Sequence, residues 1–175
     1  MTYRNRTDML ADRTYGMSLG AEIGVMRGVN LANLLALRPD LTMYGIDPWS
    51  VPHGKWGAED MSGFYLEAIR RLAPFQDRCF LIKGFSAEVS NSFEDASLDF
   101  VFIDGDHSYD SVVDDIIHWA PKVRKGGKLI GHDYYSFRWP EVTKAVRDVL
   151  GEEAKGIQTQ EKCWCWEWKQ KSAYM

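Results

Sequence analysis

The chain has 175 residues, of which 45% are hydrophobic and 26% are charged, and this composition is typical of one globular domain with its own core. Its formal net charge of −4 at pH 7 leaves no basic surface for a polyanion, so we expect no nucleic-acid partner. No apolar run has the length that a bilayer span needs, and residues 1–13 lack the apolar stretch of a signal peptide, so we expect no membrane partner.

We expect a single domain over residues 1–175, with an N-terminal helical segment (1–16), a central core (17–150) and a C-terminal hairpin (151–175). Short apolar runs, each followed closely by Gly, Asp or His, are typical of buried parallel strands. They predict five strands, at Leu19–Ile23, Thr42–Ile46, Cys79–Ile82, Leu98–Ile103 and Lys128–Ile130.

Four further segments carry apolar residues at spacings of three and four, which is the pattern of amphipathic helices. They lie at Leu31–Leu35, Phe64–Leu72, Val112–Ile117 and Val142–Val149. Parallel strands need crossover connections, and helices are the usual ones. The sequence therefore predicts an α/β, Rossmann-like doubly wound fold with helices on both faces of a mostly parallel sheet.

The tail from Gly156 to Trp168 predicts an antiparallel hairpin at the end of this sheet. Within it, period-two alternation puts Trp164, Trp166 and Trp168 on one face and the cysteines on the other. We interpret the tryptophans as packing residues. The three cysteines match neither a zinc site nor a disulfide framework, which favours reduced thiols and a cytoplasmic location: Cys79, Cys163 and Cys165.

Polar residues follow every predicted strand. In an open α/β sheet, ligands bind beyond the carboxyl ends of the strands, where the winding direction reverses. The residues delivered to that edge are Glu22, Gly24, Asp47, Gly84, Ser86, Asp104, Asp106, His107, His132 and Asp133. We therefore expect the functional site at this edge.

The turn from Gly20 to Gly28 follows the first strand, and its glycines permit a tight backbone and close ligand approach. Such a turn alone also fits a simple strand-to-helix connection. However, Asp47 lies 23 residues after Gly24 (47 − 24), near the spacing at which an acid meets ribose hydroxyls. Glu22 would repel a pyrophosphate and suits a ligand with ammonium and sulfonium groups, as in S-adenosylmethionine. NAD is the weaker choice.

Three motifs resemble class I S-adenosylmethionine-dependent methyltransferases: Glu-Ile-Gly-Val-x-x-Gly (22–28), Phe-Ile-Asp-Gly-Asp-His-Ser-Tyr (102–109) and Gly-His-Asp-Tyr (131–134). The resemblance spans residues 19–150 and is strongest to small single-domain members of the catechol and macrocin type. It implies a seven-stranded sheet that ends in an antiparallel hairpin. The core at 17–150 would then be the cofactor-binding part.

The resemblance also implies a set of cofactor-binding residues. Glu22 and Gly24 would contact the methionine part, Asp47 the ribose, and Phe85 with Ser86 the adenine. Trp49 would wall the adenine or ribose, although Phe85 equally fits a core position. The full expected set is Glu22, Gly24, Gly28, Asp47, Trp49, Phe85, Ser86 and Asp104.

A hydroxyl acceptor must lose its proton during methyl transfer, and a divalent ion with a nearby base promotes that loss. The similarity to catechol and caffeoyl-coenzyme A O-methyltransferases suggests a metal site at Asp104, His132 and Asp133. Imidazole is an uncommon ligand for Mg²⁺ and suits Mn²⁺ better. His107 follows Asp104 by three residues and is the expected general base, with Asp104 the second candidate catalytic residue.

The expected activity is O-methylation of a small hydroxylated molecule, such as a sugar or a natural product. A metal-independent methyltransferase and a non-catalytic nucleotide-binding or regulatory module are open alternatives. The irregular segment 48–60 fits a lid. The acceptor and the oligomeric state stay open, with a homo-oligomer as one option.

Overall fold

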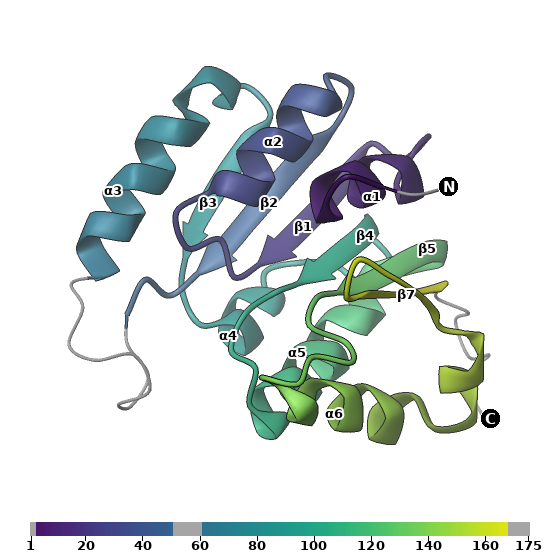
Figure 1. Cartoon of the computed structure of the whole chain (residues 1–175). Helices are drawn as coiled ribbons and strands as arrows, with labels where there is room; N and C mark the ends of the chain where they lie inside the picture. Colours follow the sequence, from purple (N-terminus) through teal and green to yellow (C-terminus); the bar gives the residue numbers. More distant parts are fainter. Residues whose placement is uncertain (1–2, 51–60, 168–175) are drawn as a thin grey trace.

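The computed structural model describes residues 3–50 and 61–167. Its centre is a seven-stranded sheet in the order β3-β2-β1-β4-β5-β7-β6 (Figure 1). The strands are β1 (Leu19–Ile23), β2 (Thr42–Asp47), β3 (Cys79–Lys83), β4 (Leu98–Ile103), β5 (Val123–Gly131), β6 (Gln158–Gln160) and β7 (Cys163–Glu167). The first five run parallel, and β7 is antiparallel to both β5 and β6. The predicted fold class is confirmed.

Helices cover both faces of the sheet (Figure 1). One face carries α1 (Arg6–Arg13), α2 (Val29–Leu37) and α3 (Met61–Leu72), and the other carries α4 (Ser86–Ser90), α5 (Tyr109–Trp119) and α6 (Pro140–Leu150). Short 3₁₀ turns follow α3, α5 and α6 at Ala73–Phe75, Ala120–Lys122 and Gly151–Gly156. The chain winds outward from β1 to β3 and then in the opposite direction from β4, so the winding reverses between β1 and β4.

Each face of the sheet has its own apolar core. Leu31, Leu34 and Leu35 of α2 are fully buried on one face, and Val112, Ile116 and Trp119 of α5 are buried on the other. The spacing of these residues matches the helical period read from the sequence. Residues pointing alternately up and down from the strands complete both cores, as expected for a sheet covered on two sides.

The C-terminal hairpin differs in one detail from the prediction. Residues Gly151–Gly156 form a 3₁₀ turn that continues α6, so the hairpin strands begin only at Gln158. Trp164 and Trp166 pack into the core beneath α5 and α6, while Cys163 and Cys165 are buried in the opposite core. The packing interpretation of these two tryptophans is therefore confirmed. Trp168 lies outside the described residues.

Within residues 3–50 and 61–167, no helix combines the length and apolar character needed to cross a bilayer. Most of the segment 48–60, whose irregular sequence fits a lid, lies outside these ranges.

Candidate active site

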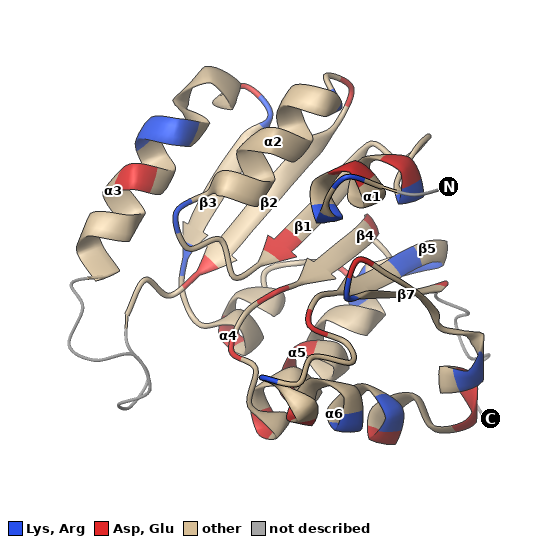
Figure 2. Cartoon of the chain, viewed as in Figure 1, with Lys and Arg blue, Asp and Glu red and all other residues tan. Residues whose placement is uncertain are grey.

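A cavity of about 720 Å³ lies beyond the carboxyl ends of β1, β2, β4 and β5, between them and the starts of α4 and α5. It therefore occupies the point where the winding direction reverses. Figure 2 shows acidic segments at the ends of β1 and β2 and in the loop after β4. Most of the predicted site residues line it: Glu22, Gly24, Asp47, Phe85, Ser86, Asp104, His107, His132 and Asp133.

Glu22 is a buried acid that faces this cavity. Its side chain is 2% exposed, and one carboxylate oxygen accepts a 3.0 Å hydrogen bond from Asn30 Nδ2. Asn30 is held in turn by Thr7 of α1, whose hydroxyl donates to Asn30 Oδ1 at 2.9 Å. Burial, followed by the charge of Asp104, raises the pKa of Glu22 to about 8. A cationic ligand would offset the cost of burying the Glu22 charge and favour the ionised form of the carboxyl.

Gly24 and Gly28 shape the turn after β1 in different ways. Gly24 has a φ of +90°, and a Cβ there would lie 2.3 Å from the carbonyl oxygen of Asp104. The turn can therefore pass against the end of β4 only with glycine. Gly28 has a φ of +71° and packs against Ala68 and Leu72 of α3. It is absent from the lining of the described cavity, so its evident task is helix packing.

Asp47 holds the loops on either side of the cavity together. Its Oδ2 accepts a hydrogen bond from the backbone amide of Met26 at 2.8 Å, and its Oδ1 accepts one from the amide of Trp49 at 2.7 Å. Trp49 itself is 3% exposed, packs against Tyr65 and donates from Nε1 to the Met26 carbonyl. Trp49 is therefore a buried residue that helps to hold Asp47. It is not among the described residues that line the cavity.

Phe85 and Ser86 mark the far end of the cavity, at the start of α4. Phe85 is 51% exposed and lines the cavity, so it is not the core residue that the alternative interpretation required. Ser86 also lines the cavity, and its hydroxyl accepts a 2.7 Å hydrogen bond from Trp119 Nε1. The Ser86 hydroxyl is thus already oriented by the protein.

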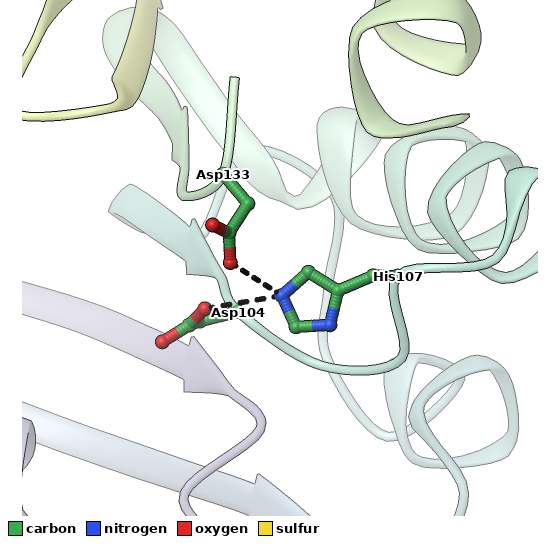
Figure 3. A group of neighbouring side chains, drawn as sticks. All are labelled: Asp104, His107 and Asp133. Atoms are coloured by element: carbon green, nitrogen blue, oxygen red, sulfur yellow. Dashed lines mark ion pairs between the residues drawn. The ribbon is translucent and has the colours of Figure 1, made fainter. Parts of the chain in front are cut away.

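Asp104, His107, His132 and Asp133 converge at the near end. His107 Nε2 lies 2.8 Å from Asp133 Oδ2 and 3.8 Å from Asp104 Oδ1, and Figure 3 shows the imidazole pointing between the two carboxylates. His132 Nδ1 lies 3.0 Å from Asp133 Oδ2 and 3.5 Å from Asp104 Oδ1. Asp133 has a φ of +57°, a backbone conformation that is uncommon outside glycine and concentrates at functional sites.

The charges of this cluster shift its pKa values in opposite directions. Burial would raise the pKa of Asp104, but contacts with His107 and His132 and the charge of Arg6 lower it to about 2. Burial would lower the pKa of His107, but Asp104 and Asp133 outweigh it and raise that pKa. In the absence of another cation, His107 therefore carries its proton to a higher pH than a free imidazole does.

The cluster has the donor set of a divalent-metal site. One ligand atom each from Asp104, His107 and Asp133 lie within 4.8 Å of one another. His107 Nε2 is buried, and in the described part of the chain no acceptor meets it with regular hydrogen-bond alignment. Two carboxylates with imidazole suit Mn²⁺, Fe²⁺ or Zn²⁺ better than Mg²⁺. This set contains His107, where the sequence suggested His132, although His132 Nδ1 lies about as close to the same two carboxylates.

Several cavity residues were not predicted from the sequence, and three of them stand out by their contacts or burial. Arg6 reaches from α1 to Asp104, with Nη1 2.6 Å from Oδ2. Trp139, just before α6, stacks on His107 with ring centroids 4.9 Å apart and an angle of 20° between the planes. Asp115 lies on the buried side of α5. Only Asp115 carried a sequence signal, since it is an acid at an apolar position of an amphipathic helix.

Comparison with known proteins connects this geometry to methyl transfer. Residues 21–134 match the model of a family described as a methyltransferase domain. An uncharacterized protein of Acanthamoeba polyphaga mimivirus is 26% identical over 142 residues, which cover 77% of this chain and 60% of that protein. The chain thus spans about 60% of the length of this curated relative.

Solved methyltransferases share the fold. The Podospora anserina methyltransferase PaMTH1, solved with S-adenosylhomocysteine, matches with a TM-score of 0.71 at 12% identity over 97% of this chain and 80% of that one. A TDP-rhamnose 3′-O-methyltransferase of calicheamicin biosynthesis gives 0.66 at 17% identity, over 93% and 77%. The O-methyltransferase NovP gives 0.63 at 20% identity, over 94% and 78%.

Proposed function

This chain belongs to the family of methyltransferase domains, and we propose that it transfers the methyl group of S-adenosylmethionine to a hydroxyl of a small molecule, such as a sugar or a natural product. The observation that carries this proposal is the buried, cavity-facing carboxyl of Glu22. Without a ligand it is a desolvated acid with a raised pKa. An ammonium and a sulfonium in the cavity would stabilise it, whereas a pyrophosphate would not.

The other contacts of the cofactor follow the order of the strands. Glu22 would hold the methionine part near Asn30, and Asp47 would accept a hydrogen bond from a ribose hydroxyl. Asp47 already accepts amide hydrogen bonds from Met26, Trp49 and Val25, and a carboxylate has about four acceptor positions, so capacity remains for a ribose hydroxyl. The end with Phe85 and Ser86 would take the adenine. These contacts fix the methyl donor, which is a large part of the catalysis of an in-line displacement.

For the chemical step, we propose that Asp104, His132 and Asp133 hold a divalent cation and that His107 accepts the acceptor's proton. When bound, the cation lowers the pKa of the acceptor hydroxyl. Trp139 stacks on His107 and fixes the plane of its ring. Because His107 is also placed to be a ligand, the two histidines need separate tests. Loss of Mn²⁺ binding in His107→Ala, with normal binding in His132→Ala, would mean that His107 is the metal ligand and His132 the proton acceptor.

One observation favours the metal-independent alternative. Arg6 already places a cation 2.6 Å from Asp104, so that carboxylate is neutralised by the protein itself. In that case Asp104 would orient the cofactor or acceptor and His107 would act alone. A non-catalytic regulatory module would keep cofactor binding and show no transfer.

The test is transfer of a labelled methyl group from S-adenosylmethionine to a panel of glycosides, catechols and amines, with Mn²⁺, with Mg²⁺ and with EDTA. We expect labelled methyl ethers, more with Mn²⁺ than with Mg²⁺, and loss of the product with EDTA. Activity that EDTA leaves unchanged would support the metal-independent alternative. Label on nitrogen or carbon acceptors alone would contradict O-methylation.

A further inference from the structure

Asp115 is a carboxyl group in an unusual place. It lies on α5 among the apolar residues that face the sheet, Val112, Ile116 and Trp119, and its side chain is only 6% exposed. The exposed remainder opens into the cavity, at the end that also contains Ser86 and Ser111. A helix position that faces the core ordinarily carries an apolar residue.

The surroundings make an ionised Asp115 costly. Burial raises its pKa to about 7, and the negative charges of Asp114 on the same helix and Asp106 in the preceding loop act in the same direction. The Ser86 hydroxyl from α4 and the charge of His118 act against this rise. A buried acid whose nearest charged neighbours include two acids destabilises the fold, and such groups concentrate where a ligand needs them.

A short hydrogen-bond chain fixes the orientation of this carboxyl. Trp119 Nε1 donates to the Ser86 hydroxyl at 2.7 Å, and that hydroxyl bonds to Asp115. Because the Ser86 oxygen accepts from the indole, its own proton is free to point at the carboxyl. Ser86 is therefore the positioning residue, and the Asp115 carboxylate is the hydrogen-bond acceptor offered to the ligand.

The loop after β4 leaves open space beside this carboxyl. A Cβ added to Gly105 in that loop would lie 3.5 Å from Asp115 Oδ2, and its next neighbour among the described residues would be Ile23 at 3.9 Å. Glycine thus leaves open the space immediately next to the carboxyl. Phe85, half exposed at the same end, supplies an apolar wall.

We propose that Asp115 is the residue that selects adenine, by accepting a hydrogen bond from the exocyclic amino group of the cofactor's base. This inference rests on the proposed use of S-adenosylmethionine. A base that carries an oxygen in place of the amino group would turn an acceptor toward the carboxylate, and the two oxygens would repel each other. Other purines would thereby be rejected at this end of the cavity.

The experiment compares two ligands by isothermal titration at pH 8, above the pKa of about 7 so that most of Asp115 is ionised: S-adenosylhomocysteine and its deaminated analogue, S-inosylhomocysteine. The wild-type chain should bind the adenine compound at least roughly 10-fold more tightly, as expected for a hydrogen bond to a charged group. In Asp115→Asn, the amide can turn its NH₂ group toward the oxygen of hypoxanthine, so the preference should fall to about one or reverse. Asp110→Asn, an exposed acid of the same helix, is the matched control and should keep the wild-type ratio.

The outcomes separate this inference from the proposed function. Equal binding of both ligands by the wild-type chain overturns the role of Asp115 without any variant, so it decides the matter even if Asp115→Asn does not fold. An unchanged preference in a folded Asp115→Asn overturns it as well. In both cases S-adenosylhomocysteine still binds and the proposed function stands. Failure of the wild-type chain to bind either ligand overturns both.

Discussion

The guanidinium of Arg6 and the carboxylate of Asp104 form a 2.6 Å ion pair that joins the first turn of α1 to the end of β4. Through this pair and the bond between Thr7 and Asn30, α1 closes one side of the cavity. The same pair puts a protein cation on the carboxylate that we propose as a metal ligand. Arg6 and the proposed divalent ion would therefore compete for Asp104.

Arg6→Ala should strengthen Mn²⁺ binding by roughly 3-fold to 10-fold, because it removes the competing cation from a mostly buried carboxylate. Titration of free Mn²⁺ by electron paramagnetic resonance measures this directly. Arg4→Ala is the control, since Arg4 pairs with Asp8 at an exposed position. Weaker Mn²⁺ binding in Arg6→Ala would contradict the competition.

Glu22→Gln should bind S-adenosylhomocysteine at least roughly 10-fold more weakly, because the amide cannot neutralise the ligand's ammonium. Without ligand, the same variant should be more stable than wild type at high pH. The folded pKa of Glu22 is raised from 4.5 to about 8. The stability that this group contributes is therefore complete below 4.5 and is lost as the pH rises through 8.

Thermal unfolding between pH 5 and pH 9 checks the second effect, and the melting temperature of Glu22→Gln should exceed that of wild type by a widening margin. The exposed Glu94→Gln variant should run parallel to wild type throughout. A constant gap for Glu22→Gln would mean that the buried carboxyl is not the titrating group.

His107 should titrate above its ordinary value of 6.5 in the metal-free protein, because Asp104 and Asp133 outweigh the effect of its burial. Nuclear magnetic resonance of the imidazole C–H groups gives the midpoint. Asp133→Asn removes one of the two charges and should move the midpoint to lower pH, while Asp110→Asn should not move it. An unshifted midpoint in Asp133→Asn would show that the 2.8 Å contact does not control this histidine.

His107→Ala should reduce turnover far more than it reduces cofactor affinity. The reason is that the proposed general base takes a proton from the methyl-accepting substrate and does not act on the cofactor. A steady-state assay with the affinity for S-adenosylhomocysteine measured in parallel separates the two effects. Equal losses of turnover and affinity, or loss of neither, would remove His107 from the mechanism.

Gly24→Ala should destabilise the fold by about 3 kcal/mol or more, because its Cβ would meet the Asp104 carbonyl at 2.3 Å with a φ of +90°. Gly63→Ala in α3 is the matched control. A Cβ at Gly63 meets no atom of the described residues within 4 Å, so that substitution should stabilise by roughly 0.5 kcal/mol. Chemical denaturation measures both. Similar stabilities for the two variants would refute the close approach of the first turn to β4.

The fold was predictable because its signals are local. Each parallel strand is a short buried run, and each helix buries one stripe, so residues such as Leu31 and Leu35 reveal their environment by spacing alone. The acids at the strand ends were predictable for the same reason, since parallel strands bring their carboxyl ends to one edge.

The rest of the site depends on contacts between distant segments. Arg6 meets Asp104 across 98 residues, and no local pattern reports that approach. Trp49 resembled a ligand wall by sequence position, yet the Asp47 carboxylate and the Met26 carbonyl hold it in the core. His107 and His132 both reach the two carboxylates, and this arrangement involves the left-handed backbone at Asp133 and the stacking of Trp139 on His107. Sequence spacing does not encode these orientations.

The central claim is that this cavity binds S-adenosylmethionine. Isothermal titration of the chain with S-adenosylmethionine, S-adenosylhomocysteine and NAD tests it most directly. We expect saturable 1:1 binding of the first two ligands and no measurable heat with NAD. Tight binding of NAD, with no response to either S-adenosyl compound, would contradict the account.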